Sequence, residues 1–155
     1  MQVRWADVGD VDELIRLRAV MYASMGEPHE DDGWRAVVAE QLKAGLPDGR
    51  YFAAVVDAPD GEAGLATCGV GMVWHRLAGP GEHTGLLGYI MSMATDPRWR
   101  GRGYARAVFA RLMQRFTADG VTRVSLHASV YGLPLYRSFG FRESAYPELY
   151  SPKPA

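Results

Sequence analysis

The residues of this 155-residue chain best suited to chemistry lie in one short stretch that alternates arginine with glycine. Its members are Arg98, Arg100, Gly101, Arg102 and Gly103. An apolar run over 87–95 precedes the stretch and a helical pattern over 104–119 follows it, which predicts a turn at a helix N-terminus. The first amides of a helix have no intrahelical partner and carry the positive end of its dipole, and guanidinium groups hold phosphate oxygens. The stretch therefore predicts a binding turn for a diphosphate.

Two other phosphate-binding motifs are excluded by residue type. A P-loop needs a lysine after its last glycine, but the only lysines are Lys43 and Lys153. A dinucleotide fingerprint needs a third glycine where Arg106 stands. On this stretch alone, a surface loop that merely joins a strand to a helix stays open as the alternative.

Length and composition predict one domain over residues 1–155. The formal net charge of -1 excludes bulk attraction to nucleic acid or to an anionic membrane. The single cysteine, Cys68, excludes a disulfide framework and a cysteine-based zinc site, and no metal site is predicted. The N-terminus lacks a signal peptide, and no apolar stretch approaches the roughly 20 residues of a membrane span. We expect a cytoplasmic protein, and the sequence leaves open whether it acts alone or as a homodimer.

Hydrophobic periodicity and turn residues predict alternating strands and helices. Strands are expected over 2–5, 51–57, 66–75, 87–95 and 121–128, helices over 11–22, 34–42, 104–119 and 133–139, and a final hairpin over 141–150. Asp7 or Asp10 is expected to cap the first helix and Asp32 the second. Strands 87–95 and 121–128 are expected to be parallel across the intervening helix, which puts the glycine turn at the carboxyl edge of the sheet.

Two motifs in the expected order resemble those of a known family. The pattern Arg98-x-x-Gly101-x-Gly103, between a strand and a helix, resembles the acyl-CoA-binding motif of the GNAT superfamily of N-acetyltransferases. About thirty residues later, the segment 127–141 resembles the superfamily's C-terminal signature, with Leu135-Tyr136, three residues, then Gly140-Phe141. The resemblance covers nearly the whole chain. It implies an α/β GNAT fold, with a mixed, mostly antiparallel sheet of about seven strands, a splayed parallel pair at its centre and helices on both faces.

The resemblance also implies a cofactor, acetyl-CoA, and roles for particular residues. The backbone of Met93 and Thr95 would hold the pantetheine arm, and Ser129 stands where many relatives place an asparagine that contacts it. Tyr136 stands at the position of the family's general acid. The turn would hold the diphosphate through Arg98, Arg100, Gly101, Arg102, Gly103, Tyr104 and Ala105.

The implied reaction is attack of a primary amine, from a small molecule or a peptide, on the acetyl thioester. Near neutral pH only about one alkylamine in a few thousand is unprotonated, so a proton must be removed. Many relatives use a glutamate on the fourth strand, but 87–95 contains no carboxylate. The base is therefore left open among a water relayed by His127, by Ser92 or by a loop carboxylate. A non-catalytic acyl-CoA-binding module is the alternative function.

An acidic stretch over 27–32 separates the first two predicted helices. Its four carboxylates would attract a cationic acceptor if the stretch forms part of the acceptor pocket. The alternative is structural, because acidic residues at a helix start suit its dipole and cap its first amides.

Overall fold

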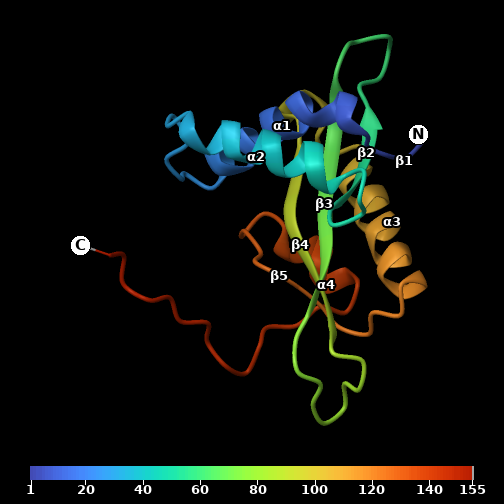
Figure 1. The fold of residues 1–155 in the computed structure, drawn as a ribbon. Coiled ribbons are helices and arrows are strands. Elements are labelled where there is room, and N and C mark those ends of the chain that lie inside the picture. Colours follow the sequence, from blue (N-terminus) through green and yellow to red (C-terminus); the bar gives the residue numbers. More distant parts are fainter. Residues whose placement is uncertain (155) are drawn as a thin grey trace.

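The strands of the protein form one mixed sheet that follows the chain order β1-β2-β3-β4-β5, as the computed structural model of residues 1–154 shows (Figure 1). The first four strands pair antiparallel, and β4 pairs parallel with β5. The strands are β1 (Arg4–Trp5), β2 (Phe52–Asp57), β3 (Leu65–His75), β4 (Leu86–Thr95) and β5 (Val124–Leu126).

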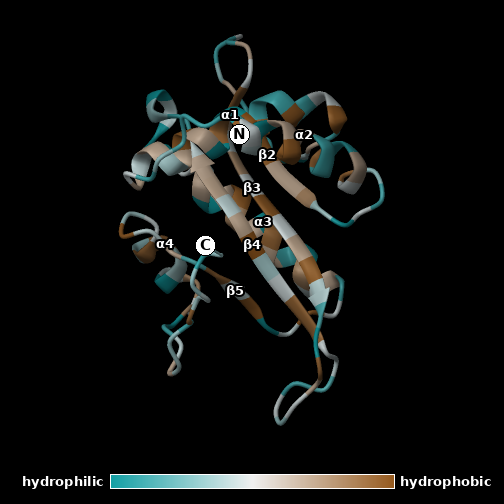
Figure 2. Cartoon of the chain, turned by 60° about the vertical axis from the view of Figure 1, so that its left-hand side comes forward, coloured by the Kyte–Doolittle hydropathy of each residue, from teal (hydrophilic) through white to brown (hydrophobic). Residues whose placement is uncertain are grey.

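Helices cover both faces of this sheet, as the resemblance implies. On one face lie α1 (Val11–Ser24) and α2 (Gly33–Gly45), and on the other lie α3 (Tyr104–Ala118) and the short α4 (Leu133–Ser138) (Figure 2). The fully apolar start of β2 explains the two layers, because alternate residues of a strand face opposite sides. Ala53 and Val55 pack under α1, whereas Phe52, Ala54 and Val56 pack under α3. Within residues 1–154, none of the helices combines the length and apolarity that crossing a bilayer requires.

The sheet has five strands among residues 1–154, so the expected count of about seven was too high. The predicted hairpin over 141–150 has no strand structure. Its residues alternate poorly between apolar and polar, and Pro147 lacks the amide that a ladder needs. The predicted strand 121–128 is reduced to Val124–Leu126, because the N–H of Val121 donates to Phe116 in the turn that ends α3.

Aspartates begin both N-terminal helices, as expected, but the second helix uses a different one from that predicted. Asp7 caps a short 3-10 helix, η1 (Val8–Asp10), that leads into α1, and Asp10 accepts from the Asp7 amide in return. At the start of α2 the carboxylate of Asp31 accepts from the Gly33 amide at 2.8 Å. Asp32 makes no capping bond and pairs with Arg35 instead, so the predicted cap was off by one residue.

One residue of β4 has no partner on β3, and it marks where the sheet opens. Ser92 pairs with Val70 and Ile90 pairs with Gly71, which leaves Met91 as a β-bulge. The parallel pairing of β4 with β5 covers Gly88–Ile90 and stops there. Beyond Met91, β4 therefore runs on to Thr95 without β5 beside it.

A buried carboxylate fixes the end of β4 against α1. Asp96 is 4% exposed, accepts from the backbone and side chain of Arg98 at 3.0–3.1 Å, and pairs with Arg16 of α1 at 2.8 Å. It caps the 3-10 turn η2 (Pro97–Trp99) that leads into the glycine turn. The hydrogen bonds from Arg98 and Arg16 hold the pKa of Asp96 well below its usual range, although burial acts the other way.

We expect Asp96→Asn to lower the free energy of unfolding by about 2 kcal/mol, because it removes charge-assisted hydrogen bonds to a buried carboxylate whose arginine partners are partly exposed. Asp48→Asn is the matched control, because Asp48 bonds Arg50 in the same local pattern but on the surface. The lowered pKa means that the Asp96 contribution is complete above the ordinary carboxyl pKa of about 4 and is lost as the pH falls below it. Urea unfolding at pH 7 and at pH 3 measures both effects. An equal loss in the two variants at pH 7 would contradict the assignment.

Candidate acyl-CoA site

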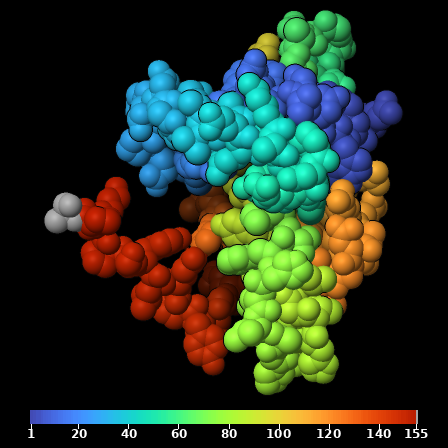
Figure 3. Space-filling model, in the orientation of Figure 1, coloured from blue at the N-terminus to red at the C-terminus, as the bar shows by residue number. Residues whose placement is uncertain are grey.

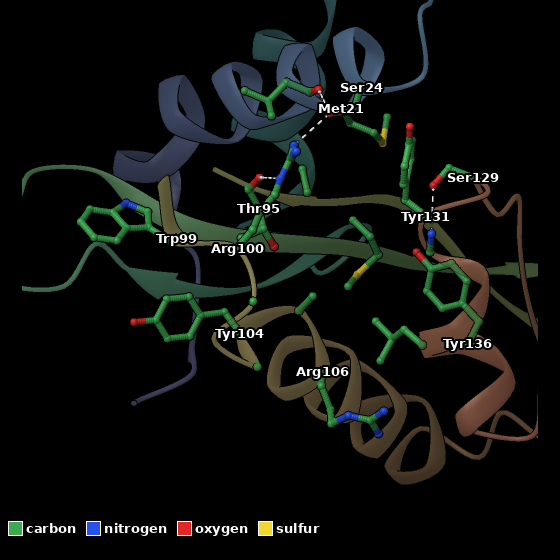
Figure 4. A pocket seen from close by; sticks show the side chains of 18 of the residues that line it. Met21, Ser24, Thr95, Trp99, Arg100, Tyr104, Arg106, Ser129, Tyr131 and Tyr136 are labelled. Carbon is green, nitrogen blue, oxygen red and sulfur yellow. Dashed lines mark hydrogen bonds between the residues drawn. The ribbon is translucent and has the colours of Figure 1, made fainter. Parts of the chain in front are cut away.

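A cavity of about 580 Å³ lies where β4, the glycine turn, α3, α4 and the last turns of α1 meet (Figure 4). Its wall contains nine of the eleven residues to which the resemblance gives a role in the site. These are Met93, Thr95, Arg100, Gly101, Gly103, Tyr104, Ala105, Ser129 and Tyr136. Arg98 and Arg102 are not among its lining residues.

The glycine turn presents bare backbone amides to this cavity. Gly101 and Gly103 have φ of 74° and 80°, a left-handed conformation that favours glycine. Gly103 is the N-cap of α3 and supplies no side chain, and within residues 1–154 nothing accepts from the amides of residues 104–106. Three free donors at the positive end of a 15-residue helix are suited to hold an anion through backbone alone.

The three arginines of the turn point to different partners. Arg98 is held by Asp96 and pairs with Glu62 at 3.5 Å. Arg102 lies over the ring of Trp99, with its guanidinium carbon 5.0 Å from the ring centroid. Arg100 alone lines the cavity, where it donates to the carbonyl of Thr95 at 3.3 Å and to the hydroxyl of Ser24 at 2.9 Å.

The open part of β4 offers a free strand edge along the cavity. The amide of Asp96 donates to Ala66 of β3, so by alternation the backbone groups of Met93 and Thr95 point away from β3. The bond from Arg100 to the Thr95 carbonyl agrees with this direction. Because β5 has already ended its pairing at Ile90, these groups face the cavity edge rather than another strand.

Tyr136 brings a hydroxyl to the opposite side of the cavity. The side chain of this α4 residue is 8% exposed, and its ring packs on Phe109 at 5.2 Å between centroids and closely against Gly132. The hydroxyl has no hydrogen-bond partner within residues 1–154 and points into the cavity (Figure 4). Burial raises the pKa of Tyr136, so the hydroxyl keeps its proton at neutral pH.

Ser129 shapes the turn before α4. Its hydroxyl and its carbonyl both accept from the Gly132 amide, at 3.2 and 3.1 Å. This bond occupies the side chain that stands at the asparagine position of many relatives.

Two of the candidate bases can now be compared. Ser92 is buried and accepts from Arg18 at 2.5 Å, so its hydroxyl oxygen is already bound to a cation. His127 is more than half exposed, and it contacts both Tyr89 and Glu148. The remaining nucleophile to consider is Cys68, whose thiol could carry the acyl group only as a thiolate. Its side chain is fully buried, and desolvation raises its pKa to about 12, so the thiol stays protonated.

The sequence did not reveal one wall of the cavity, which the end of α1 provides through Val20, Met21, Ser24 and Met25. Ser24 and Met25 lie beyond the predicted helix 11–22, and of the four only Met21 belonged to its predicted apolar face. Ser24 and Arg100 are 76 residues apart, and no local pattern links them.

Solved structures of known proteins share this fold. A predicted acetyltransferase from Clostridium acetobutylicum, solved with acetyl-CoA, superposes with a TM-score of 0.85 at 22% identity, over 96% of this chain and 95% of that one. A GCN5-related N-acetyltransferase from Ralstonia eutropha gives a TM-score of 0.80 at 24% identity, over 98% and 97%. Glucosamine-6-phosphate N-acetyltransferase from Arabidopsis thaliana gives 0.75 at 17%, over 97% of each chain.

Curated proteins offer no match in sequence. The sequence pattern of the acetyltransferase (GNAT) family, however, matches residues 13–141, which include the glycine turn, the open strand and Tyr136. The chain belongs to the acetyltransferase (GNAT) family.

Proposed function

We propose that the protein is an acetyl-CoA-dependent N-acetyltransferase that acetylates a primary amine of a small molecule or peptide by direct attack. One observation carries the proposal: a single cavity joins a free strand edge, three unpaired helix amides and a buried tyrosine hydroxyl. The acetyl-CoA in the structurally similar Clostridium protein supports the same choice of acyl donor.

The residues that line the cavity fit acetyl-CoA as the acyl donor. The backbone of Met93 and Thr95 would bind the pantetheine arm, and the amides of residues 104–106 with Arg100 would bind the diphosphate. Trp99 lines the cavity through its ring, and its buried indole N–H has no acceptor among residues 1–154. Arg98 and Arg102 would then act indirectly, by holding η2 and Trp99 in place.

Acetyl-CoA, when bound, supplies an acyl group activated as a thioester. Tyr136 holds a proton at the cavity wall, where a departing thiolate needs one, and its raised pKa keeps that proton in place until it is required. The apolar surroundings of the ring exclude water and fix its direction.

Thiol release from acetyl-CoA in the presence of a panel of primary amines tests the proposal, with acetyl-CoA binding measured by calorimetry on the same sample. Amine-dependent release supports an N-acetyltransferase. Binding without release from any amine would instead support an acyl-CoA-binding module without catalysis.

The acidic stretch over 27–32 does not line the cavity, and a role in attracting a cationic acceptor rests on its charge alone. The carboxylate of Glu30 accepts from the neighbouring His29 amide and stays exposed, and Asp31 caps α2. We expect Glu30→Gln combined with Asp31→Asn to raise the acceptor KM and weaken its salt dependence, while acetyl-CoA affinity stays the same. Asparagine still caps a helix, so stability should change little. Acceptor kinetics that match the wild type across ionic strengths would leave the stretch a structural role only.

A further inference from the structure

Three side chains that the cavity does not include form a hydrogen-bonded chain beside it. The Tyr89 hydroxyl of β4 lies 2.6 Å from Nδ1 of His127, the residue after β5. On the other side of the ring, Nε2 of His127 contacts a carboxylate oxygen of Glu148. Glu148 belongs to the C-terminal segment, which we define as residues 142–154. In Figure 3 a hollow separates this segment, in red, from the strands of the sheet.

The order of the three groups, hydroxyl, imidazole and carboxylate, favours proton transfer from the hydroxyl to the imidazole. A carboxylate accepts hydrogen bonds, so Glu148 favours the tautomer of His127 that carries its proton on Nε2. Nδ1 is then left as an acceptor for the Tyr89 hydroxyl. The same order removes a proton from a hydroxyl in enzymes that use a hydroxyl nucleophile. Burial, and next the charge of Glu148, raise the pKa of Tyr89, so its oxygen carries a proton at neutral pH.

The chain lies at the point where β4 and β5 separate. Tyr89 is in register with Ser125 in the last paired part of the two strands, and it precedes the Met91 bulge by two residues. His127 precedes the cavity residue Ser129 by two residues. The Tyr89 hydroxyl also lies on the α1 side of the sheet, near Arg18 and Tyr22, whereas Tyr136 approaches from α4 on the other side. A proton acceptor and a proton donor thus flank the opening.

We propose that Tyr89, His127 and Glu148 form the proton relay that deprotonates the attacking amine, an inference that rests on the proposed N-acetyltransferase function. The ammonium group of the acceptor first gives a proton to the Tyr89 oxygen, while Tyr89 gives its own proton to Nδ1 of His127, and the freed electron pair of the amine nitrogen then bonds to the acyl carbon. The carbon–sulfur bond breaks, the sulfur keeps the electron pair and takes a proton from Tyr136, and Tyr136 recovers, through water, the second proton that the amide nitrogen releases. Glu148 stabilises the imidazolium, which returns its proton to water.

The charged and titratable neighbours of Tyr89 agree with this assignment. Besides His127, they include Arg18 and Tyr22 from α1 and Glu148 and Tyr150 from the C-terminal segment. Arg18 is occupied by the carbonyl of Met91 and the hydroxyl of Ser92. Glu148 is therefore the one carboxylate among these neighbours, and it supplies the negative charge that 87–95 lacks.

The test compares three variants with matched controls from the same regions. Tyr89→Phe and His127→Gln should each lower kcat about 100-fold, the loss expected for general base catalysis, with unchanged acetyl-CoA affinity. Glu148→Gln removes only the positioning partner and should cost about 10-fold. The controls are the exposed residues Tyr146, His75 and Glu143, and Tyr146→Phe, His75→Gln and Glu143→Gln should turn over normally. The difference in kcat between His127→Gln and the wild type should become smaller as the pH rises, because a larger fraction of the acceptor amine is already neutral.

A second readout is independent of activity. Nitrogen NMR of the His127 ring should show the proton on Nε2 in the wild type, and Glu148→Gln should mix the two tautomers while Glu143→Gln does not. Wild-type turnover in all three variants, or a ring tautomer indifferent to Glu148, would overturn the relay while the N-acetyltransferase function stands. Acetyl-CoA binding without turnover in the wild type would overturn both proposals.

Discussion

Replacing Gly101 or Gly103 with aspartate is expected to weaken acetyl-CoA binding about 100-fold or more. Each variant would put a carboxylate beside the free amides of α3, where it competes with the diphosphate for the same donors. A hydrogen bond to a charged group contributes about 1.5–3 kcal/mol and about 1.4 kcal/mol corresponds to a factor of ten, so losing two such bonds accounts for the estimate. Isothermal titration calorimetry at fixed salt measures it.

Two controls separate charge from backbone strain. Gly120→Asp places the same residue at φ 77° beyond the other end of α3, again in open space, and should leave acetyl-CoA affinity unchanged. Gly103→Asn keeps the shape of the aspartate without its charge, and asparagine tolerates the left-handed conformation. We expect it to lose about tenfold less affinity than Gly103→Asp, since electrostatic attraction at the helix end is retained. Wild-type affinity in both aspartate variants would refute the anion site.

Tyr136→Phe is expected to lower turnover about 100-fold while acetyl-CoA affinity changes little. Loss of a general acid costs two to four orders of magnitude in rate. The substitution keeps the ring that packs on Phe109 and Gly132, and the hydroxyl it removes has no hydrogen-bond partner within residues 1–154. The free energy of unfolding should therefore be almost unchanged. Single-turnover kinetics, with thiol release followed directly, isolates the chemical step.

Tyr131→Phe is the matched control, because Tyr131 lines the same cavity but is 83% exposed. It should turn over like the wild type. If Tyr136→Phe also kept its rate in single-turnover conditions, the proton would have to come from another group, and Tyr136 would be a packing residue. If Tyr136→Phe instead lowered only the affinity for acetyl-CoA, the hydroxyl would be assigned to binding acetyl-CoA and not to protonating the leaving sulfur.

The sequence predicted those parts of the fold that local patterns determine. The run of apolar residues in β2, the helical periodicity of α1 and α3 and the two left-handed glycines each leave a signal within about fifteen residues. The parallel pairing of β4 with β5 followed from the helix between them, and it is confirmed. The glycine turn was found from its residue types and position, and Tyr136 from the resemblance to the family's C-terminal signature, and the structure brings them to one cavity.

The missed features depend on contacts between distant residues. The predicted final hairpin was wrong because its apolar residues do not alternate with polar ones and Pro147 lacks the amide that a strand ladder needs. The contact of Glu148 with His127 joins residues 21 apart across an irregular segment. The α1 wall of the cavity depends on where the helix packs, and periodicity gives the buried face of a helix but not its neighbour.

The bulge at Met91 shows that the cavity depends partly on how many residues β4 contains, and not only on which residues they are. Residues on both sides of Met91 keep consecutive partners on β3, so the ladder would be continuous if this one residue were absent. Its presence bends β4 and coincides with the end of its pairing to β5. Many side chains would serve at position 91 for this purpose, because the bend comes from an extra peptide unit. The opening between β4 and β5 thus depends on the length of β4 relative to β3. A comparison of residue types alone does not reveal it.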